Sequence, residues 1–385
     1  MTAAAERRRL LIVLGTRPEA IKLAPVILEA RRAADRFVPL VVTTGQHRQM
    51  LDQVLELFDI RTDVDLSIMS HDQDLRHITT QALDGLYDAI RQHRPDCVVV
   101  QGDTTTAFAG ALAAFYHRLP VAHVEAGLRS YDAYQPFPEE INRRLISHLA
   151  DYHFAPTDSA RSNLLAEGID KDRIWVTGNT GIDALLGVLE RARTGPRPRR
   201  NGRTLLVTAH RRENHGDPMR RICGALLRLL GRFPDLRVVF PVHLSPRVRE
   251  TVLPLLSGHP RVELREPLDY REFVLAMDDA DVILTDSGGV QEEAPSLRKP
   301  VLVLREKTER SEAIEAGTAS LVGTDEEMIV SETALLLEDG ERYARAIAAV
   351  NPYGDGRASA RILQVLGNHH DPERLPLGNG HAAER

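Results

Sequence analysis

The segment 284–295 combines a strand end, a glycine turn and a carboxylate. After an apolar run it reads Ser287-Gly288-Gly289 and continues into residues that favour a helix. Such a break leaves backbone N–H groups and the positive end of a helix free, an arrangement that binds phosphate. Glu293 would lie about one helical turn further on, where its carboxylate could accept two hydrogen bonds from a ribose diol. The segment predicts a nucleotide-diphosphate site, although alone it also fits a glycine turn that caps an ordinary helix.

A second set of polar residues follows apolar runs in the first half of the chain. Arg17 and Lys22 come after one such run, near an expected helix start, where both could meet an anion. Asp103 and Glu125 each follow another run. Because the carboxyl ends of parallel strands converge on one crevice, we expect Asp103 and Glu125 to be neighbours.

Three further polar residues have two interpretations each. Glu139 opens an apparent helix with Arg143 four residues later, which indicates either a functional pair or a surface salt bridge. His210 ends an apolar run at an expected sheet edge, so it is a site candidate as well as a candidate for a buried core histidine. His123 lies within a strand-like run, and there a buried, hydrogen-bonded histidine is as good an interpretation as a functional one.

Composition narrows the class of protein. The chain has 385 residues, 43% of them hydrophobic, which suffices for two domains with separate cores. A formal charge of −6 gives no electrostatic reason to bind nucleic acid or an anionic membrane. No run approaches the ~20 apolar residues of a membrane span. Cys97 and Cys223 lie in apolar stretches and should be buried free thiols. We expect a soluble cytoplasmic protein.

The elements that must position these residues alternate between strand-like and helix-like runs. We expect strands at 10–14, 38–43, 97–100, 121–125, 152–155, 204–208, 236–241, 282–285 and 300–304. This is a βαβ pattern repeated twice, which predicts an α/β fold with two Rossmann-like domains. The stretch 193–202, rich in proline, glycine and charge, is typical of a surface linker.

Several familiar motifs are missing from the sequence. The first expected strand-to-helix turn is not GxGxxG, and no GxxxxGK[ST] occurs, which argues against a dehydrogenase and a P-loop enzyme. There is no HExxH, no paired CxxC and no GxSxG. We therefore predict no metal site.

A series of longer motifs runs in order through residues 10–367: GTRPEAIKLAP (15–25), TGQHRQMLDQVL (44–55), QGDTTT (101–106), HVEAGLRS (123–130), FPEEINRR (137–144), TAHRREN (208–214), PVHLSPRVRE (241–250), TDSGGVQEEAPSLRKPVLVLR (285–305), TERSEAIEAGT (308–318) and NPYGDGRAS (351–359). Together they resemble the non-hydrolysing UDP-N-acetylglucosamine 2-epimerases of bacteria. The resemblance implies the two-domain fold of B-type nucleotide-sugar glycosyltransferases, with the domains facing a cleft. We expect a first domain over 1–185, a second over 203–350, a helix at 353–368 that crosses back to the first, and a flexible tail at 369–385.

The resemblance also implies a reaction and roles for the candidate residues. UDP-N-acetylglucosamine and UDP-N-acetylmannosamine would interconvert through anti elimination of UDP, which gives 2-acetamidoglucal, and re-addition of UDP. Removing the C2 proton and returning one to the other face needs a group of carboxylates, which Asp103, Glu125 and Glu139 supply without showing which does which. Leaving-group charge would be stabilised by Arg17, by His210 and by the amides of the Ser-Gly-Gly turn.

By the same resemblance Glu293 holds the ribose, while Arg310 and Phe273 help to bind the nucleotide. Lys22 would order the sugar site, and Arg143 is counted with the substrate-binding residues. No metal or redox cofactor is implied, and the partner is a UDP-sugar. A homodimer is expected.

The resemblance further implies a second, allosteric UDP-N-acetylglucosamine site. The matching residues are Gln46, His47, Gln49 and Gln73. Asp72 departs from the pattern, because a carboxylate there would repel a second diphosphate. A helix start packed for structure is the alternative interpretation of Gln46 and His47.

Other functions stay open at this point. An epimerase for a modified UDP-sugar would differ near the loop 131–135. A glycosyltransferase of the same fold would not need three carboxylates in the domain opposite the nucleotide. A hydrolysing epimerase usually carries a fused kinase, for which the chain has no room, and carboxylates that face a diphosphate would only repel the ligand of a simple binding module.

Overall fold

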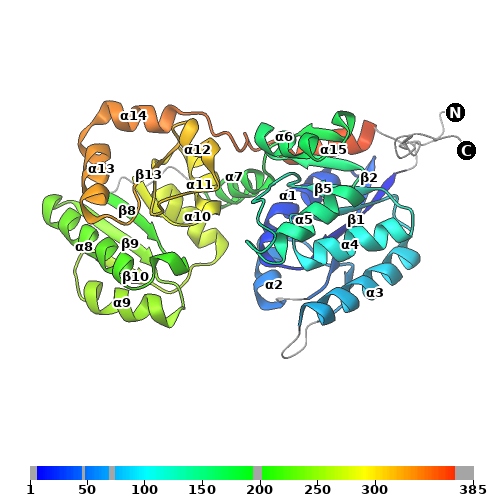
Figure 1. Cartoon of the computed structure of the whole chain (residues 1–385), viewed down its shortest axis with the longest axis horizontal. Helices are drawn as coiled ribbons and strands as arrows, with labels where there is room; N and C mark the ends of the chain where they lie inside the picture. The colour runs from blue at the N-terminus through cyan, green and yellow to red at the C-terminus, as the bar shows by residue number, and fades with distance from the viewer. Residues whose placement is uncertain (1–6, 46–47, 69–73, 194–201, 369–385) are drawn as a thin grey trace, which may run out of the picture.

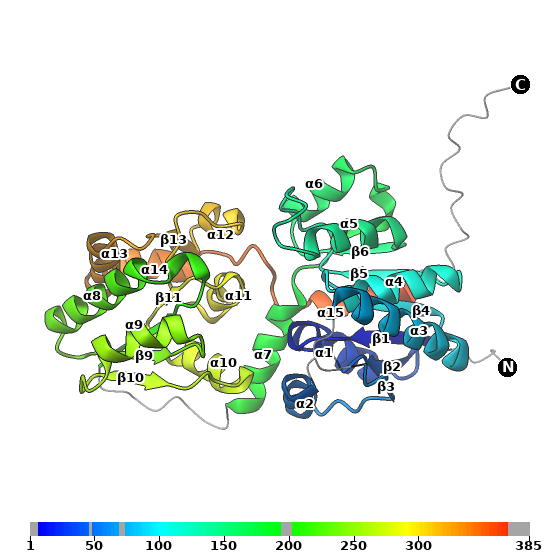
Figure 2. The same cartoon turned by 60° about the horizontal axis from the view of Figure 1, so that its bottom comes forward.

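The computed structural model describes residues 7–45, 48–68, 74–193 and 202–368. It has two α/β units, each a parallel sheet covered by helices, with α7 running between them (Figures 1 and 2). The described strands of the first sheet are β1 (Arg8–Leu14), β2 (Phe37–Thr43), β3 (Val64–Asp65), β4 (Cys97–Gln101), β5 (Val121–Val124), β6 (Tyr152–Ala155) and β7 (Ile174–Val176). Those of the second are β8 (Arg203–Thr208), β9 (Leu236–Pro241), β10 (Val262–Arg265), β11 (Val282–Thr285), β12 (Val301–Val303) and β13 (Ala319–Leu321).

The helices around the first sheet are α1 (Arg17–Arg32), α2 (Arg48–Leu57), α3 (Leu75–His93), α4 (Thr105–Tyr116), α5 (Glu139–Leu149), α6 (Asp158–Ala166) and the 3-10 helix η1 (Lys171–Arg173). α7 (Thr180–Ala192) follows. Around the second sheet lie η2 (Arg212–Asn214), α8 (Asp217–Arg232), α9 (Pro246–Leu256), α10 (Tyr270–Asp279), α11 (Gly288–Glu293), η3 (Ala294–Leu297), α12 (Ser311–Glu315), α13 (Glu326–Glu338) and α14 (Gly340–Ala348). α15 (Ala358–Asn368) is the last described helix.

Both sheets reverse their strand order at one point. The first runs β3-β2-β1-β4-β5-β6-β7 and the second β10-β9-β8-β11-β12-β13. In such a sheet a crevice opens at the carboxyl ends of the two strands that flank the reversal, here β1 with β4 and β8 with β11. The predicted α/β class with two Rossmann-like units is confirmed.

The central strands are buried on both faces, which explains why they are continuous apolar runs in the sequence. Leu10 to Leu14 of β1 and all of β4 are buried. Parallel strands covered by helices on both sides have this pattern. Cys97 and Cys223 are buried free thiols, as predicted.

Two segments connect the units. α7 is the first, and the stretch 349–357 returns the chain to the first unit, where α15 packs beside α1 (Figure 1). The Arg8 guanidinium donates to the Leu366 carbonyl at 2.6 Å, and the Ser359 N–H donates to Asp183 at 2.8 Å. Most of the predicted linker and the whole predicted tail lie outside the described residues. In the part of the chain that the structure describes, no helix is long and apolar enough to cross a membrane.

Candidate active site

Several of the predicted site residues lie at carboxyl ends of strands or in first turns of helices. Asp103 follows β4, Glu125 follows β5, and His210 follows β8. Arg17 and Glu139 are the first residues of α1 and α5. Gln49 lies in α2, while Gln46, His47, Asp72 and Gln73 lie outside the described residues.

Glu125 is the centre of a charged cluster in the first unit. Its carboxylate accepts hydrogen bonds from the Lys22 ammonium and the Gln101 side-chain amide. Burial alone would lower the pKa of Lys22, but the carboxylates of Glu125 and Glu292 hold it above its ordinary value. Lys22 is therefore a fixed positive charge beside Glu125.

Asp103 forms an ion pair with Arg143, which also lies 3.5 Å from Glu140. Burial raises the pKa of Asp103 above its ordinary value, although Arg143 and Lys22 pull it down. A partly desolvated carboxylate with a raised pKa suits proton transfer.

Glu139 does not form the surface salt bridge that its spacing also allowed. Among the described residues, the ion pairs of Arg143 are with Asp103 and Glu140 instead. The Oε2 atom of Glu139 is buried and accepts no hydrogen bond from any residue that the structure describes. It is close enough to Asp103 to raise the pKa of that carboxyl, so Glu139 belongs to the same group of carboxylates.

Sequence reasoning missed Glu19, a buried residue that is hydrogen-bonded to Thr104, next to Asp103 in the chain. Its carboxylate accepts hydrogen bonds from the N–H groups of Gly15 and Thr16, at 3.1 and 2.6 Å, and from the Thr104 hydroxyl at 2.7 Å. Burial raises its pKa to about 7. Thr16 and Glu19 form a capping box, and the spacing Thr-x-x-Glu was the signal that could have identified it.

In the second unit, Asp286 holds the backbone that carries His210. Asp286 is fully buried and accepts from the N–H groups of His210 and Arg211, both at 2.8 Å, and from the Asn214 amide at 2.9 Å. Burial would raise the pKa of Asp286, but its bonds to His210 and Arg211 outweigh that effect and lower it. Sequence reasoning did not identify Asp286.

The two histidines differ in burial. The His210 side chain is 42% exposed, with Nδ1 3.1 Å from Asp286 Oδ1, so it is no buried core residue. His123 is fully buried, donates from Nε2 to the Gly102 carbonyl at 2.7 Å, and has a pKa lowered by burial to about 3. His123 has the contacts of a structural histidine.

The predicted ribose carboxylate lies at the end of α11. The Tyr270 hydroxyl donates to Glu293 Oε1 at 3.2 Å. Burial, helped by the charge of Glu292, raises the pKa of Glu293 to about 7. Phe273, on the same helix as Tyr270, packs against the hydrophobic core. Tyr270 was missed by sequence reasoning.

Arg310 lies against the predicted phosphate turn. A Cβ added to Gly288 would be only 3.2 Å from the guanidinium carbon of Arg310, so glycine is what allows this approach. Arg310 donates to Glu292 at 2.7 Å and lies 3.1 Å from Glu309. Burial would lower the pKa of Arg310, but these two carboxylates raise it.

Charges from the two units face each other. Glu292 of the second unit acts on Lys22 of the first, and Glu125 of the first acts on Arg310 of the second. Burial raises the pKa of both Glu293 and Tyr270, and the charge of Arg17 in the first unit is near enough to oppose this effect in part. The structure thus brings Lys22, Glu125 and Arg17 of the first unit close to Arg310 and Glu293 of the second. In the described part of the chain, no hydrogen bond or ion pair joins His210 to Asp103, Glu125 or Glu139.

Known proteins show the same arrangement of sheets. A chain of a glycotransferase of kitacinnamycin shares the fold at 13% identity and a TM-score of 0.62, covering 93% of this chain and 99% of its own. A crystal structure of UDP-GlcNAc 2-epimerase from Neisseria meningitidis bound to UDP-GlcNAc is 49% identical with a TM-score of 0.83, and the match covers 93% of this chain and 99% of that one.

Sequence comparison extends this similarity to a family. The UDP-N-acetylglucosamine 2-epimerase of Yersinia pestis is 50% identical over 372 residues, which cover 94% of this chain and 99% of the relative. The family model described as UDP-N-acetylglucosamine 2-epimerase matches residues 29–367. The chain therefore belongs to the non-hydrolysing UDP-N-acetylglucosamine 2-epimerases, a family of isomerases.

Proposed function

We propose that this enzyme interconverts UDP-N-acetylglucosamine and UDP-N-acetylmannosamine by eliminating UDP and adding it back. The observation that carries the proposal is the meeting of two charge types: a group of carboxylates in the first unit faces Arg310 and the Ser-Gly-Gly turn of the second. The relative from Neisseria meningitidis is bound to UDP-GlcNAc, which supports a UDP-sugar as the substrate.

In the proposed elimination one carboxylate takes the C2 proton. The electron pair of the C2–H bond forms the C1–C2 double bond of 2-acetamidoglucal, and the C1–O bond breaks with its electrons going to the diphosphate. A second carboxylate returns a proton to the opposite face of C2 while UDP adds back to C1. Asp103, Glu125 and Glu139 are the candidates, because all three lie in one partly buried group.

The leaving diphosphate needs fixed positive charge and N–H donors. We assign this task to Arg17, to His210 and to the amides of Ser287, Gly288 and Gly289, while Arg310 helps to bind the nucleotide. Glu293 would accept hydrogen bonds from the ribose, with Phe273 beside the nucleotide. Lys22 and Arg143 would then orient the sugar through the carboxylates that they contact.

Activity in D₂O tests the mechanism. Product formed from UDP-N-acetylglucosamine should carry deuterium at C2, since the proton removed exchanges with solvent, and no free sugar should accumulate. Product without deuterium at C2 would contradict elimination, while release of free N-acetylmannosamine would indicate hydrolysis. Transfer of the sugar to an acceptor would favour the glycosyltransferase alternative, and turnover of a panel of UDP-sugars would define the sugar that is accepted.

We further propose a cytoplasmic homodimer whose two domains, 1–185 with 353–368 and 203–350, close over UDP. A second UDP-N-acetylglucosamine would activate the reverse reaction through Gln46, His47, Gln49 and Gln73. The charge of Asp72 should weaken this effector, so Asp72→Gly should lower the effector concentration for half activation. Conversion of UDP-N-acetylmannosamine at the full rate with no UDP-N-acetylglucosamine present would contradict the second site.

A further inference from the structure

Glu292 lies beside the proposed ribose residue but makes different contacts. Its side chain is 6% exposed, and its two carboxylate oxygens bind two different groups. Oε1 accepts a hydrogen bond from Arg310 Nε at 2.7 Å, and Oε2 accepts one from the Asn179 side-chain amide at 2.8 Å. Glu292 therefore joins a cation of the proposed nucleotide site to a residue at the start of α7.

Asn179 lies where the two connections between the units meet. Its side-chain oxygen accepts from the Gly181 N–H at 2.8 Å and caps α7, the first connection. Its own N–H donates to the Tyr353 carbonyl of the second connection at 2.7 Å. Any shift of these connections relative to α11 would change the contact between Asn179 and Glu292.

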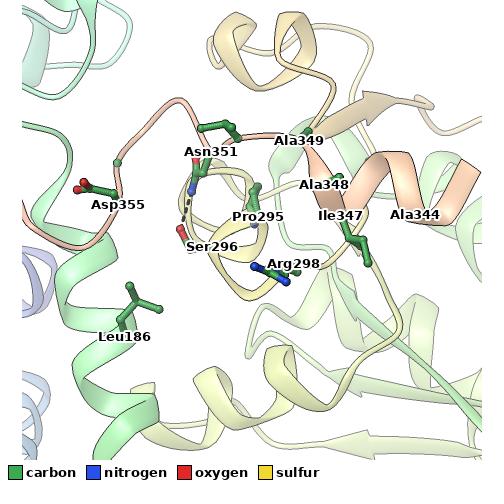
Figure 3. Close-up of a pocket in the computed structure, with 12 residues that line it drawn as sticks. Leu186, Pro295, Ser296, Arg298, Ala344, Ile347, Ala348, Ala349, Asn351 and Asp355 are labelled. Carbon is green, nitrogen blue, oxygen red and sulfur yellow. Dashed lines mark hydrogen bonds between the residues drawn. The ribbon is translucent and has the colours of Figure 1, made fainter.

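The second connection is itself tied to Glu292. Asn351 donates its two amide hydrogens to the Glu292 carbonyl, at 2.8 Å, and to the Ser296 hydroxyl, at 2.7 Å. Figure 3 shows Asn351 reaching from this connection to Ser296 in η3. A cavity of about 590 Å³ lies beside it, lined in part by Leu186 and Ile347. Tyr353 of the same connection is buried in the hydrophobic core, and the polar contacts of Asn351 and Asn179 hold the connection against Glu292.

Glu292 sets the orientation of the Arg310 side chain. The guanidinium lies within 3.4 Å of the place where a Gly288 Cβ would be, so it is held directly against the start of α11. Its other acidic partner, Glu309, has a side chain that is 43% exposed, whereas that of Glu292 is 6% exposed. Ion pairs of exposed residues are weak, so Glu292 is the stronger constraint.

We propose that Glu292 is a positioning residue that holds Arg310 at the nucleotide site and, through Asn179, makes nucleotide affinity depend on how the two units are placed. This inference rests on the proposed function, because it takes Arg310 to bind the UDP moiety. Glu292 itself does not touch the substrate in this proposal. Its role is to transmit the state of the connections to Arg310.

Two variants test the two contacts separately, with UDP as the probe. Glu292→Gln keeps the size of the side chain but removes the charge that holds Arg310. It should weaken UDP binding and raise KM about tenfold, while kcat changes less than about threefold. A binding contact that is equally strong in the substrate complex and in the transition state affects KM alone. Asn179→Ser keeps a residue that can cap α7 but is too short to reach Glu292, and it should weaken UDP binding about threefold.

The double variant decides whether the contacts are coupled. Glu292→Gln with Asn179→Ser should bind UDP no more weakly than Glu292→Gln alone, because the second contact acts only through the first. Arg193→Gln is the matched control: it removes the 2.7 Å ion pair of Arg193 with Asp278, at the other end of α7, and should leave UDP affinity unchanged.

Calorimetric titration with UDP, together with melting temperatures of each variant, separates the outcomes. Additive effects of the two substitutions, or wild-type UDP affinity in Glu292→Gln, would overturn the inference while leaving the proposed function intact. If Glu292→Gln does not fold, wild-type UDP affinity in Asn179→Ser overturns it equally. Wild-type protein that fails to bind UDP would instead overturn the proposed function and the inference with it.

Discussion

The Thr104 hydroxyl donates a hydrogen bond to the Glu19 carboxylate at 2.7 Å and so ties together two turns of the first unit. One turn, after β1, carries Arg17, and the other, after β4, carries Asp103. Thr104 and Glu19 are 85 positions apart in the sequence. A single buried carboxylate thus fixes the spacing between a proposed phosphate-binding cation and a proposed catalytic acid.

Glu19 should make the stability of the enzyme depend on pH. Burial raises its pKa from 4.5 to about 7, so the folded state binds a proton more tightly than the unfolded state. The free energy of unfolding should therefore fall as the pH rises from 4.5 to 7, by an amount on the order of 3 kcal/mol from this residue. Urea unfolding of wild type and Glu19→Gln across this range measures the effect. A difference between the two proteins that does not change with pH would contradict it.

Neutralising a proposed catalytic carboxylate should affect the chemical step. Asp103→Asn or Glu125→Gln should lower kcat by about 10²-fold or more, because the amide cannot accept or supply the proton. UDP affinity should change little, since neither residue is assigned to the nucleotide. Steady-state kinetics with a UDP titration distinguishes the two effects, and an unchanged kcat in both variants would remove them from the mechanism.

Glu293 should make UDP bind more tightly as the pH rises. A carboxylate that accepts two ribose hydrogen bonds must be ionised, and burial raises the pKa of Glu293 to about 7. Glu293→Ala should cost roughly 1–3 kcal/mol of UDP binding at pH 8. The affinity of the wild type for UDP should increase between pH 6 and 8 more than that of Glu293→Gln. The comparison with this variant also corrects for the titration of the UDP phosphate. Tyr270→Phe, which removes only the 3.2 Å bond to Glu293, should have a smaller effect on affinity.

Much of the fold and part of the site could be predicted from the sequence because the signals are local. A run such as Leu10 to Leu14 predicts a strand buried on both faces, and the Ser-Gly-Gly turn predicts where a strand becomes a helix. Four short strands, β3, β7, β10 and β13, were not predicted. Each has only two to four residues, and β10 alternates between half-buried and exposed residues, so none forms a continuous apolar run.

The supporting carboxylates could not be predicted because their partners are distant in the sequence. Glu292 and Asn179 are 113 positions apart, and Asp286 is 76 positions from His210. Periodicity says which face of an element is buried, but it does not say which polar groups meet once two elements pack. Glu139 and Arg143 show the same limit, since their spacing on one helix also allowed a pair, whereas Arg143 pairs with the distant Asp103 and with Glu140 on its own helix.

UDP should draw the two units together. His210 and the Ser-Gly-Gly turn lie in the second unit, whereas the carboxylates and Arg17 lie in the first, so neither unit holds a complete site. Closure would use the connections near 180–203 and 350–357. Small-angle scattering should show a smaller radius of gyration with saturating UDP, and an unchanged radius would contradict closure.

Substitutions of His210 and Asp286 should both lower kcat but should differ in their cost to stability. His210→Ala should lower kcat by about 10²-fold because a donor to the leaving diphosphate is lost, yet both backbone N–H bonds to Asp286 remain. Asp286→Asn should also lower kcat, since the neutral amide no longer orients His210, and it should cost more stability at pH 7. The pKa of Asp286 is lowered on folding, so its stabilisation is present above 3.8 and is lost as the pH falls through the folded pKa. The difference in unfolding free energy between wild type and Asp286→Asn should therefore shrink in acid. The difference for His210→Ala should shrink in acid as well, because the His210 side chain is the main group that lowers the pKa of Asp286. A wild-type kcat in His210→Ala would remove this histidine from the site.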